Sequence, residues 1–169
     1  MGQGATFLIA LPVGIVPAAP LPIPPNVPEG HAGHGHTILV VDDEPSLASG
    51  LARLLQRDGY IVDKVANGRL ALAALETRTY DLILCDVRMP ELDGPSLYRF
   101  LERQYPHLCP RLVFLTGDTL EPATRDFLEA SGAPCLMKPF TIAEARRVIQ
   151  RVLSTQSPAS PGAVPPSPT

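Results

Sequence analysis

The stretch Ile38–Glu44 reads Ile-Leu-Val-Val-Asp-Asp-Glu, four apolar residues followed at once by three acidic ones. An apolar run without polar alternation is typical of a strand that is covered on both of its faces. Three further runs of this kind follow along the chain: Leu82–Cys85, Leu112–Leu115 and Cys135–Met137. A more mixed run, Tyr60–Val65, contains two charged residues and is typical of an edge strand. The pattern predicts a parallel sheet with helices on both faces.

The segments around these runs carry apolar residues at helical spacing or are rich in Ala and Leu: Leu47–Leu55, Asn67–Thr77, Leu97–Leu101, Phe127–Leu128 and Ala145–Val152. Gly59 and Gly132 favour helix ends after the first and the fourth of them. Before the last one, Thr141 and Glu144 stand at the spacing of a capping box. The order of strand and helix, repeated five times, predicts an open doubly wound α/β sheet with right-handed crossovers.

The composition divides the 169-residue chain into three parts. Nearly all of the charge, including all 14 basic residues, lies in residues 37–154, whereas prolines are concentrated in residues 12–28 and 158–168. We therefore expect one globular domain at residues 37–154. The net charge of −3 provides no basic field, so neither nucleic acid nor an anionic membrane is indicated as a partner.

The uncharged head of the chain does not suit export or insertion into a membrane. Proline interrupts it every few residues, which argues against a spanning helix, and Met1–Gly4 lacks the basic residue that starts a signal peptide. The cysteines Cys85, Cys109 and Cys135 form no Cys-x-x-Cys pair that would indicate a zinc site or a disulfide framework. We expect a cytoplasmic protein with reduced thiols.

Polar residues stand where four of the predicted strands end: Asp42 and Asp43 after the first, Asp86 after the third, Thr116 after the fourth and Lys138 after the fifth. In doubly wound sheets, ligands bind at this carboxyl edge. Three carboxylates with one lysine nearby repel one another and need a cation to stay ionised. An oxygen-only set of ligands points to Mg²⁺. A carboxylate beside such an ion can act as a nucleophile toward phosphorus.

Four motifs resemble those of response-regulator receiver domains of two-component signalling, in the same order and each at a predicted strand end. They are Ile38–Glu44, Asp86–Pro90 with Asp93-Gly94, Phe114–Gly117 and Lys138–Phe140. The resemblance covers residues 37–154. It implies a flavodoxin-like fold, in which five parallel strands take the order 2-1-3-4-5.

The resemblance also implies roles for the acidic residues. Asp86 would be the phosphoacceptor, and it would bind Mg²⁺ together with Asp42, Asp43 and the backbone carbonyl of Arg88. By themselves, the two adjacent aspartates could equally cap the first helix. Arg88 and Asp118 occupy positions at which receivers tune dephosphorylation, and there they would either pair across the site or face solvent.

For the remaining polar residues, the resemblance implies that Thr116 is the switch hydroxyl and Lys138 the ammonium that binds the phosphoryl group, ahead of a cis peptide bond to Pro139. The alternatives are that Thr116 is a turn residue and that Lys138 is a solvated surface charge. One position departs from the family pattern. Many receivers have an aromatic residue three positions before the lysine, and this chain has Cys135 there, which puts the usual route of signal output in doubt.

The flanking segments have their own expectations. Residues 2–12 resemble the last glycine box and terminal strand of histidine-kinase ATPase domains, so residues 1–12 would be a remnant of such a domain unless they are an arbitrary apolar start. Residues 13–36 are expected to form a Pro/Gly/His-rich linker, and residues 155–169 a disordered tail. Three histidines of the linker either bind a transition metal weakly or stay solvated: His31, His34 and His36.

We expect a receiver that accepts a phosphoryl group from a phosphohistidine onto Asp86, as part of a hybrid histidine kinase. Its partner would be a histidine kinase or a histidine-phosphotransfer protein, and the oligomeric state is left open. Alone, the domain would catalyse only its own phosphotransfer and dephosphorylation. The alternatives are a stand-alone single-domain response regulator, a non-phosphorylatable decoy and, more distantly, a Mg²⁺-dependent phosphohydrolase with an aspartyl nucleophile.

Overall fold

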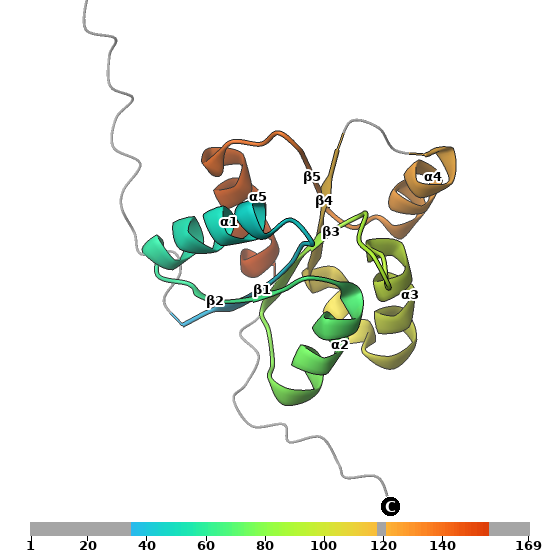
Figure 1. Cartoon of the computed structure of the whole chain (residues 1–169), viewed down its shortest axis with the longest axis horizontal. Coiled ribbons are helices and arrows are strands. Elements are labelled where there is room, and N and C mark those ends of the chain that lie inside the picture. The colour runs from blue at the N-terminus through green and yellow to red at the C-terminus, as the bar shows by residue number, and fades with distance from the viewer. Residues whose placement is uncertain (1–34, 118–120, 156–169) are drawn as a thin grey trace, which may run out of the picture. The chain divides into compact units, whose positions relative to one another are not determined.

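The computed structural model describes residues 35–117 and 121–155, and the statements below concern these residues. Strands and α-helices alternate along them, with one short 3₁₀ helix, η1 (Figure 1). The elements are β1 (Thr37–Val41), α1 (Pro45–Arg57), β2 (Ile61–Val65), α2 (Gly68–Thr77), β3 (Leu82–Asp86), α3 (Gly94–Gln104), η1 (Pro106–Arg111), β4 (Leu112–Thr116), α4 (Pro122–Ser131), β5 (Cys135–Met137) and α5 (Ile142–Ser154). The predicted remnant at residues 1–12, the linker up to residue 34, Asp118 and the tail from residue 156 lie outside the described residues.

The five strands run parallel in the order β2-β1-β3-β4-β5, which confirms the predicted fold. The mixed strand β2 lies at an edge of the sheet, as its composition predicted. The interior strand β1 pairs on both sides, since Ile38 is in register with Val62 of β2 and with Leu82 of β3. Figure 1 shows α1 and α5 together on one face of the sheet, while α2, α3 and α4 cover the other.

The alternation of side chains along β1 explains why its sequence is apolar throughout. Ile38 and Val40 belong to a core cluster that includes residues of α1 and α5, whereas Leu39 and Val41 belong to a second cluster with residues of α2, α3 and α4. Successive side chains of a strand point to opposite faces, so a strand with two covered faces needs apolar residues at every position. All four side chains are fully buried.

Polar side chains fix the starts of three helices. Asn67 accepts a hydrogen bond from the backbone of Leu70 at the start of α2, and Asp93 caps α3 in the same way. The predicted capping box of Thr141 and Glu144 is present at α5. Such caps satisfy backbone N–H groups that have no partner inside the helix. The predicted end of α4 is also confirmed, because Gly132 follows it with a φ of 63°.

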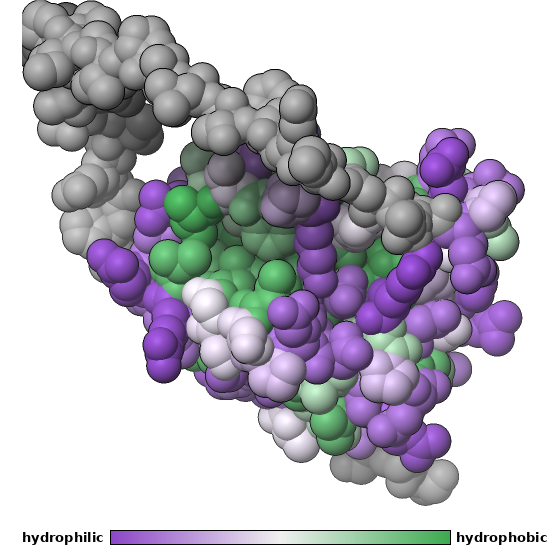
Figure 2. All heavy atoms as spheres, turned by 45° about the horizontal axis from the view of Figure 1, so that its top comes forward, coloured by the Kyte–Doolittle hydropathy of each residue, from purple (hydrophilic) through white to green (hydrophobic). Residues whose placement is uncertain are grey.

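Two apolar residues whose spacing indicated helices are exposed rather than buried, Leu54 at 37% and Phe100 at 41%. Leu54 flanks the buried residues Leu51 and Leu55 of α1, and Phe100 lines a groove together with Leu72 and Leu92. Figure 2 shows hydrophobic residues gathered on one face and bordered by hydrophilic ones. None of the helices in the described ranges has the length and apolar character that crossing a membrane requires.

The described chain begins at the amino edge of the sheet, already in contact with it. The carbonyl of His36, which the sequence assigned to the end of the linker, accepts a hydrogen bond from the backbone N–H of Ile61 at 3.0 Å. The His36 Nδ1 atom lies 3.4 Å from Oδ2 of Asp81, the residue before β3. The last residue of the predicted linker is therefore held by the sheet.

Candidate functional site

The carboxyl ends of four adjacent strands bring the predicted site residues to one edge of the sheet. Asp86 is the last residue of β3, and Thr116 is the last residue of β4. Asp42 and Asp43 directly follow β1, and Lys138 directly follows β5. Because β1, β3, β4 and β5 are neighbours in the sheet, their ends lie side by side, although the residues span almost a hundred positions of the chain.

Three carboxylates converge at this edge. Oxygens of Asp42, Asp43 and Asp86 lie within 4.8 Å of one another. Asp42 is buried, Asp86 is partly buried and Asp43 is exposed, so the cluster opens toward solvent on one side. Two unit charges about 4 Å apart repel by roughly 4 kcal/mol at an effective dielectric constant near 20. The cluster therefore favours a bound cation.

The Lys138 ammonium joins two of the three carboxylates. Its Nζ atom lies 2.9 Å from Oδ2 of Asp42 and 3.2 Å from Oδ2 of Asp86. The other oxygen of Asp42 accepts a hydrogen bond from the backbone of Glu44 at 2.8 Å. Lys138 carries a single positive charge, so it can neutralise at most one of the three negative charges. Its cis peptide bond to Pro139 agrees with the resemblance.

The capping interpretation of the acidic pair is wrong. The N-cap of α1 is Glu44, and its own side chain makes no capping hydrogen bond. Asp42 instead directs one oxygen at the Glu44 N–H and the other at Lys138, which holds its carboxylate toward the cluster. The interpretation of Lys138 as a solvated surface charge is wrong for the same reason.

Burial and charge act in opposite directions on the pKa values of this site. Burial raises the pKa of Asp86, and the nearby Lys138 ammonium reduces that rise without cancelling it. For Lys138, burial works to lower the pKa, but its hydrogen bond to Asp42 and the charge of Asp86 outweigh burial, and the pKa is raised. The lysine therefore stays charged, as an ammonium that holds an anionic group must.

The structure also places the two remaining predicted residues. Thr116 is buried, and its hydroxyl donates to the Gly117 carbonyl at 3.2 Å. Arg88 lies two residues after Asp86, with its side chain exposed, in the loop between β3 and α3. Asp118, the residue with which it would pair across the site, is outside the described residues.

Sequence reasoning assigned no role to two residues beneath the site. Gly94, the first residue of α3, lies so close to β3 that a Cβ atom there would come within 2.6 Å of the Asp86 carbonyl oxygen. The buried thiol of Cys85 donates to that same oxygen at 3.2 Å, and burial raises its pKa. For Gly94 the sequence did offer a signal in the Asp93-Gly94 pair, because glycine is favoured where one backbone segment approaches another closely.

Cys135 occupies an exposed position on β5, in register with Phe114 of β4. Aromatic rings instead gather between β4, α3 and α4, where Tyr98, Phe114 and Phe127 have centroids 5.6–6.0 Å apart. The departure that the sequence indicated therefore lies at the surface of the domain. An exposed thiol there supplies no ring that the site could bury or release.

Comparisons with known proteins agree with this geometry. Residues 38–150 match the family model described as the response regulator receiver domain. The sensor kinase CckA of Brucella abortus is 32% identical over 122 residues, which are 71% of this chain and 13% of that kinase. The transcriptional regulatory protein TcrA of Mycobacterium tuberculosis is 36% identical over 124 residues, or 73% of this chain and 48% of the regulator. The chain thus spans less than half of these relatives.

Solved structures give the same picture. The receiver domain of a signal transduction histidine kinase from Syntrophus aciditrophicus superposes with a TM-score of 0.68 at 31% identity, covering 76% of this chain and 98% of that one. The chemotaxis protein CheY4 of Vibrio cholerae superposes with a TM-score of 0.62 at 32% identity, covering 70% and 98%. The similarity therefore includes a kinase-borne receiver and a separate chemotaxis protein.

Proposed function

Because the chain belongs to the response regulator receiver family, we propose that residues 37–154 accept a phosphoryl group from a phosphohistidine onto Asp86, with Mg²⁺ in the acidic pocket. The observation that carries the proposal is the convergence of three carboxylates, with Lys138 within 3.2 Å of Asp86. The donor would be a histidine kinase or a histidine-phosphotransfer protein.

The donor atoms of the cluster fit Mg²⁺. The ion prefers oxygen ligands, keeps several waters and is usually bound through one or two carboxylates. Asp42, Asp43 and Asp86 offer carboxylate oxygens that face one another, and the exposed side at Asp43 leaves room for water. The backbone carbonyl of Arg88 would be a further ligand. When bound, the ion supplies positive charge that offsets the negative charge of the phosphoryl oxygens.

The residues of the chain would divide the remaining work. A carboxylate oxygen of Asp86 attacks phosphorus, the new O–P bond forms, and the P–N bond to the histidine breaks with its electron pair returning to the imidazole. Lys138 exchanges its contact with Asp86 for a phosphoryl oxygen. The Thr116 hydroxyl turns from the Gly117 carbonyl to donate to another phosphoryl oxygen. Each group starts from a contact at the site that it gives up in the product.

Phosphorylation with a small phosphodonor tests the assignment. Incubation with acetyl phosphate and Mg²⁺ should add one phosphoryl group, seen by intact mass, which is stable to acid and labile to base. Asp86→Asn should abolish the labelling and keep the fold, because it preserves the shape of the side chain. Asp126→Asn, at an exposed aspartate of α4, is the matched control and should label normally. Labelling that persists in Asp86→Asn would overturn the assignment.

We further propose that the receiver belongs to a hybrid sensor histidine kinase in the cytoplasm, joined to it through a linker at residues 13–36 and ending in a tail at residues 155–169. The likeness of residues 2–12 to the end of a kinase ATPase domain supports this, as do the two relatives named as kinases. CheY4 supports the alternative of a stand-alone regulator. Genomic sequence upstream of Met1 separates the two, because only the hybrid has a kinase core in frame there.

A further inference from the structure

The loop between β3 and α3 makes a sharp turn at Glu91. The Pro90 carbonyl accepts a hydrogen bond from the backbone N–H of Leu92 at 2.7 Å, and Glu91 between them has a φ of 64°. This left-handed conformation is unfavourable for a residue with a Cβ atom, and such positions persist only where surrounding contacts hold them. Contacts from another part of the chain must therefore hold Glu91 in this conformation.

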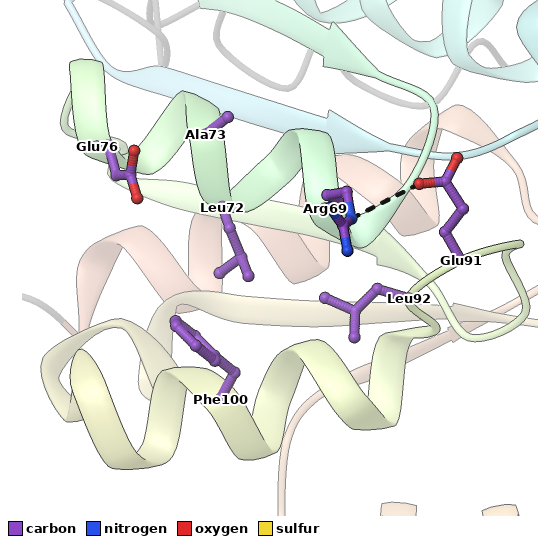
Figure 3. A pocket seen from close by; sticks show the side chains of 7 residues that line it. All are labelled: Arg69, Leu72, Ala73, Glu76, Glu91, Leu92 and Phe100. Carbon is purple, nitrogen blue, oxygen red and sulfur yellow. Dashed lines mark ion pairs between the residues drawn. The ribbon is translucent and has the colours of Figure 1, made fainter.

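The start of α2 supplies those contacts. The amide nitrogen Nδ2 of Asn67 donates to Oε1 of Glu91 at 3.1 Å, and Asn67 is only 7% exposed. The Arg69 Nε atom lies 3.8 Å from the second oxygen of Glu91, as the dashed line in Figure 3 shows. Both partners of that ion pair are well exposed, so it contributes little. The hydrogen bond from the buried Asn67 is the stronger link.

A backbone hydrogen bond holds Leu92, the residue after Glu91. The N–H of Gly68 donates to the Leu92 carbonyl at 3.1 Å, and a Cβ atom on Gly68 would lie 2.7 Å from that oxygen. The loop is held at its two ends as well, since Val87 donates to the Leu115 carbonyl and accepts from Gly94. Arg88 lies between these fixed points.

We propose that Asn67 and Glu91 form a positioning pair that sets where the Arg88 carbonyl stands relative to the acidic cluster. The inference rests on the proposed function, because the Arg88 carbonyl matters only if Mg²⁺ binds there. By fixing the strained turn, the pair orders the loop before the ion arrives, so that little ordering is left for the ion to impose. Outer contacts of this kind often change metal affinity when they are removed.

The pair is separable from the cap of α2. Asn67 uses Oδ1 to cap the helix through the Leu70 N–H at 2.9 Å, and uses Nδ2 for Glu91. A change at Glu91 therefore leaves the cap intact. Glycine at this position removes the side chain, and its relief of the left-handed backbone strain offsets the lost hydrogen bond from Asn67, so Glu91→Gly should keep a stability close to that of the wild type. Loss of stability and loss of positioning can thus be measured apart.

The test compares Glu91→Gly, Glu91→Gln and wild type. Mg²⁺ affinity is measured by NMR titration of backbone amides, and amide hydrogen exchange at Leu92 is measured in metal-free protein. Glu91→Gly should bind Mg²⁺ about tenfold more weakly, exchange the Leu92 amide faster and keep its midpoint of thermal unfolding. Glu91→Gln keeps the oxygen that Asn67 reaches and should behave as wild type. Glu76 and Glu91 both line the groove drawn in Figure 3, so Glu76→Ala, which removes an exposed acid from that groove, is the charge control.

The possible outcomes distinguish failure of the positioning pair from failure of the proposed function. Wild-type Mg²⁺ affinity and exchange in Glu91→Gly would overturn the positioning pair while leaving the proposed function intact. Weakening in Glu76→Ala or Glu91→Gln equal to that in Glu91→Gly would show that net charge, not the hydrogen bond, is responsible, and would also overturn it. A wild-type protein that neither binds Mg²⁺ nor accepts phosphate would instead remove the proposed function itself.

Discussion

At the amino edge of the sheet one carboxylate has a backbone donor and two basic side chains around it, whereas at the carboxyl edge three carboxylates lie close together. Asp81, before β3, accepts from the backbone of Thr37 at 2.8 Å and lies 3.4 Å from His36 and 3.9 Å from Arg111. Asp42, Asp43 and Asp86 lie within 4.8 Å of one another at the opposite edge. Strands β1 and β3 run from one edge to the other. The same two strands therefore connect a carboxylate with basic neighbours to a cluster of carboxylates that has an excess of negative charge.

The difference separates a residue that holds the fold from the residues to which we assign the proposed chemistry. Most local features of a folded chain agree with its stability, and exceptions concentrate at functional sites. Asp81 stabilises the start of two strands, and its backbone N–H donates in turn to the Thr37 carbonyl at 2.8 Å. The clustered aspartates repel, and only a bound cation turns this repulsion into attraction. Removing a carboxylate should therefore have opposite effects at the two edges.

The largest effect on stability is expected at Gly94, where the start of α3 packs directly against the end of β3. Gly94→Ala would place a Cβ atom 2.6 Å from the Asp86 carbonyl oxygen, so α3 or β3 must shift. We expect a loss of about 3 kcal/mol in the free energy of unfolding, measured with urea. Gly50→Ala is the control, because a Cβ atom there meets nothing within 4 Å, and it should stabilise α1 by about 0.5–1 kcal/mol. Equal effects of the two changes would contradict the packing argument.

The second prediction breaks the amino edge. Asp81→Ala removes the acceptor of the Thr37 N–H and the partner of His36 and Arg111, and hydrogen bonds to charged groups contribute about 1.5–3 kcal/mol. Because the side chain is partly buried, we expect a loss of about 2 kcal/mol in the free energy of unfolding. The Mg²⁺ affinity should not change. Asp126→Ala controls for loss of an exposed carboxylate. An unchanged unfolding curve for Asp81→Ala would show that the edge does not depend on this residue.

The two edges also differ in how far the sequence could predict them. Runs such as Ile38–Val41 identified the strands because both faces of the sheet are covered, and the carboxyl edge could be predicted because each site residue directly follows such a run. The contact of Asp81 with Thr37 joins residues 44 positions apart, and no local pattern marks it. The turn at Glu91 was missed for a related reason, since its left-handed backbone depends on Asn67 from another loop.

The third prediction removes one charge from the carboxyl edge. Without metal, Asp43→Asn should raise the free energy of unfolding by about 1 kcal/mol, because one of three mutually repelling charges is lost while the exposed site keeps its shape. With Mg²⁺ present the order should reverse, since the wild type gains more from the ion than the variant does. Thermal unfolding with EDTA and with Mg²⁺ measures both. A stabilisation by Asp43→Asn that is the same with and without Mg²⁺ would count against a metal site.

The smallest effect concerns a paired carboxylate near the carboxyl edge, Glu144 in the capping box of α5. Hydrogen bonds from the Thr141 backbone and hydroxyl lower the pKa of Glu144 below its ordinary value of 4.5. A carboxyl group with a lowered pKa in the folded state stabilises the fold above its unfolded pKa and loses that contribution as the pH falls through the folded pKa. Glu144→Gln lacks the titrating group, so the stability difference between wild type and variant should be constant near neutral pH and shrink in acid.

Urea unfolding of both proteins from neutral pH down to about pH 3, which passes below the ordinary pKa of a glutamate, follows this difference. Glu129→Gln, at an exposed glutamate of α4, shows how much a single surface carboxylate contributes without a capping box. A wild-type advantage over Glu144→Gln that stays the same throughout the acid range would mean that the ionised carboxylate does not hold the start of α5. A shrinking advantage would show that a carboxylate with hydrogen-bond donors stabilises this end of the molecule too, as Asp81 does at the amino edge. The repulsion would then be specific to the clustered aspartates.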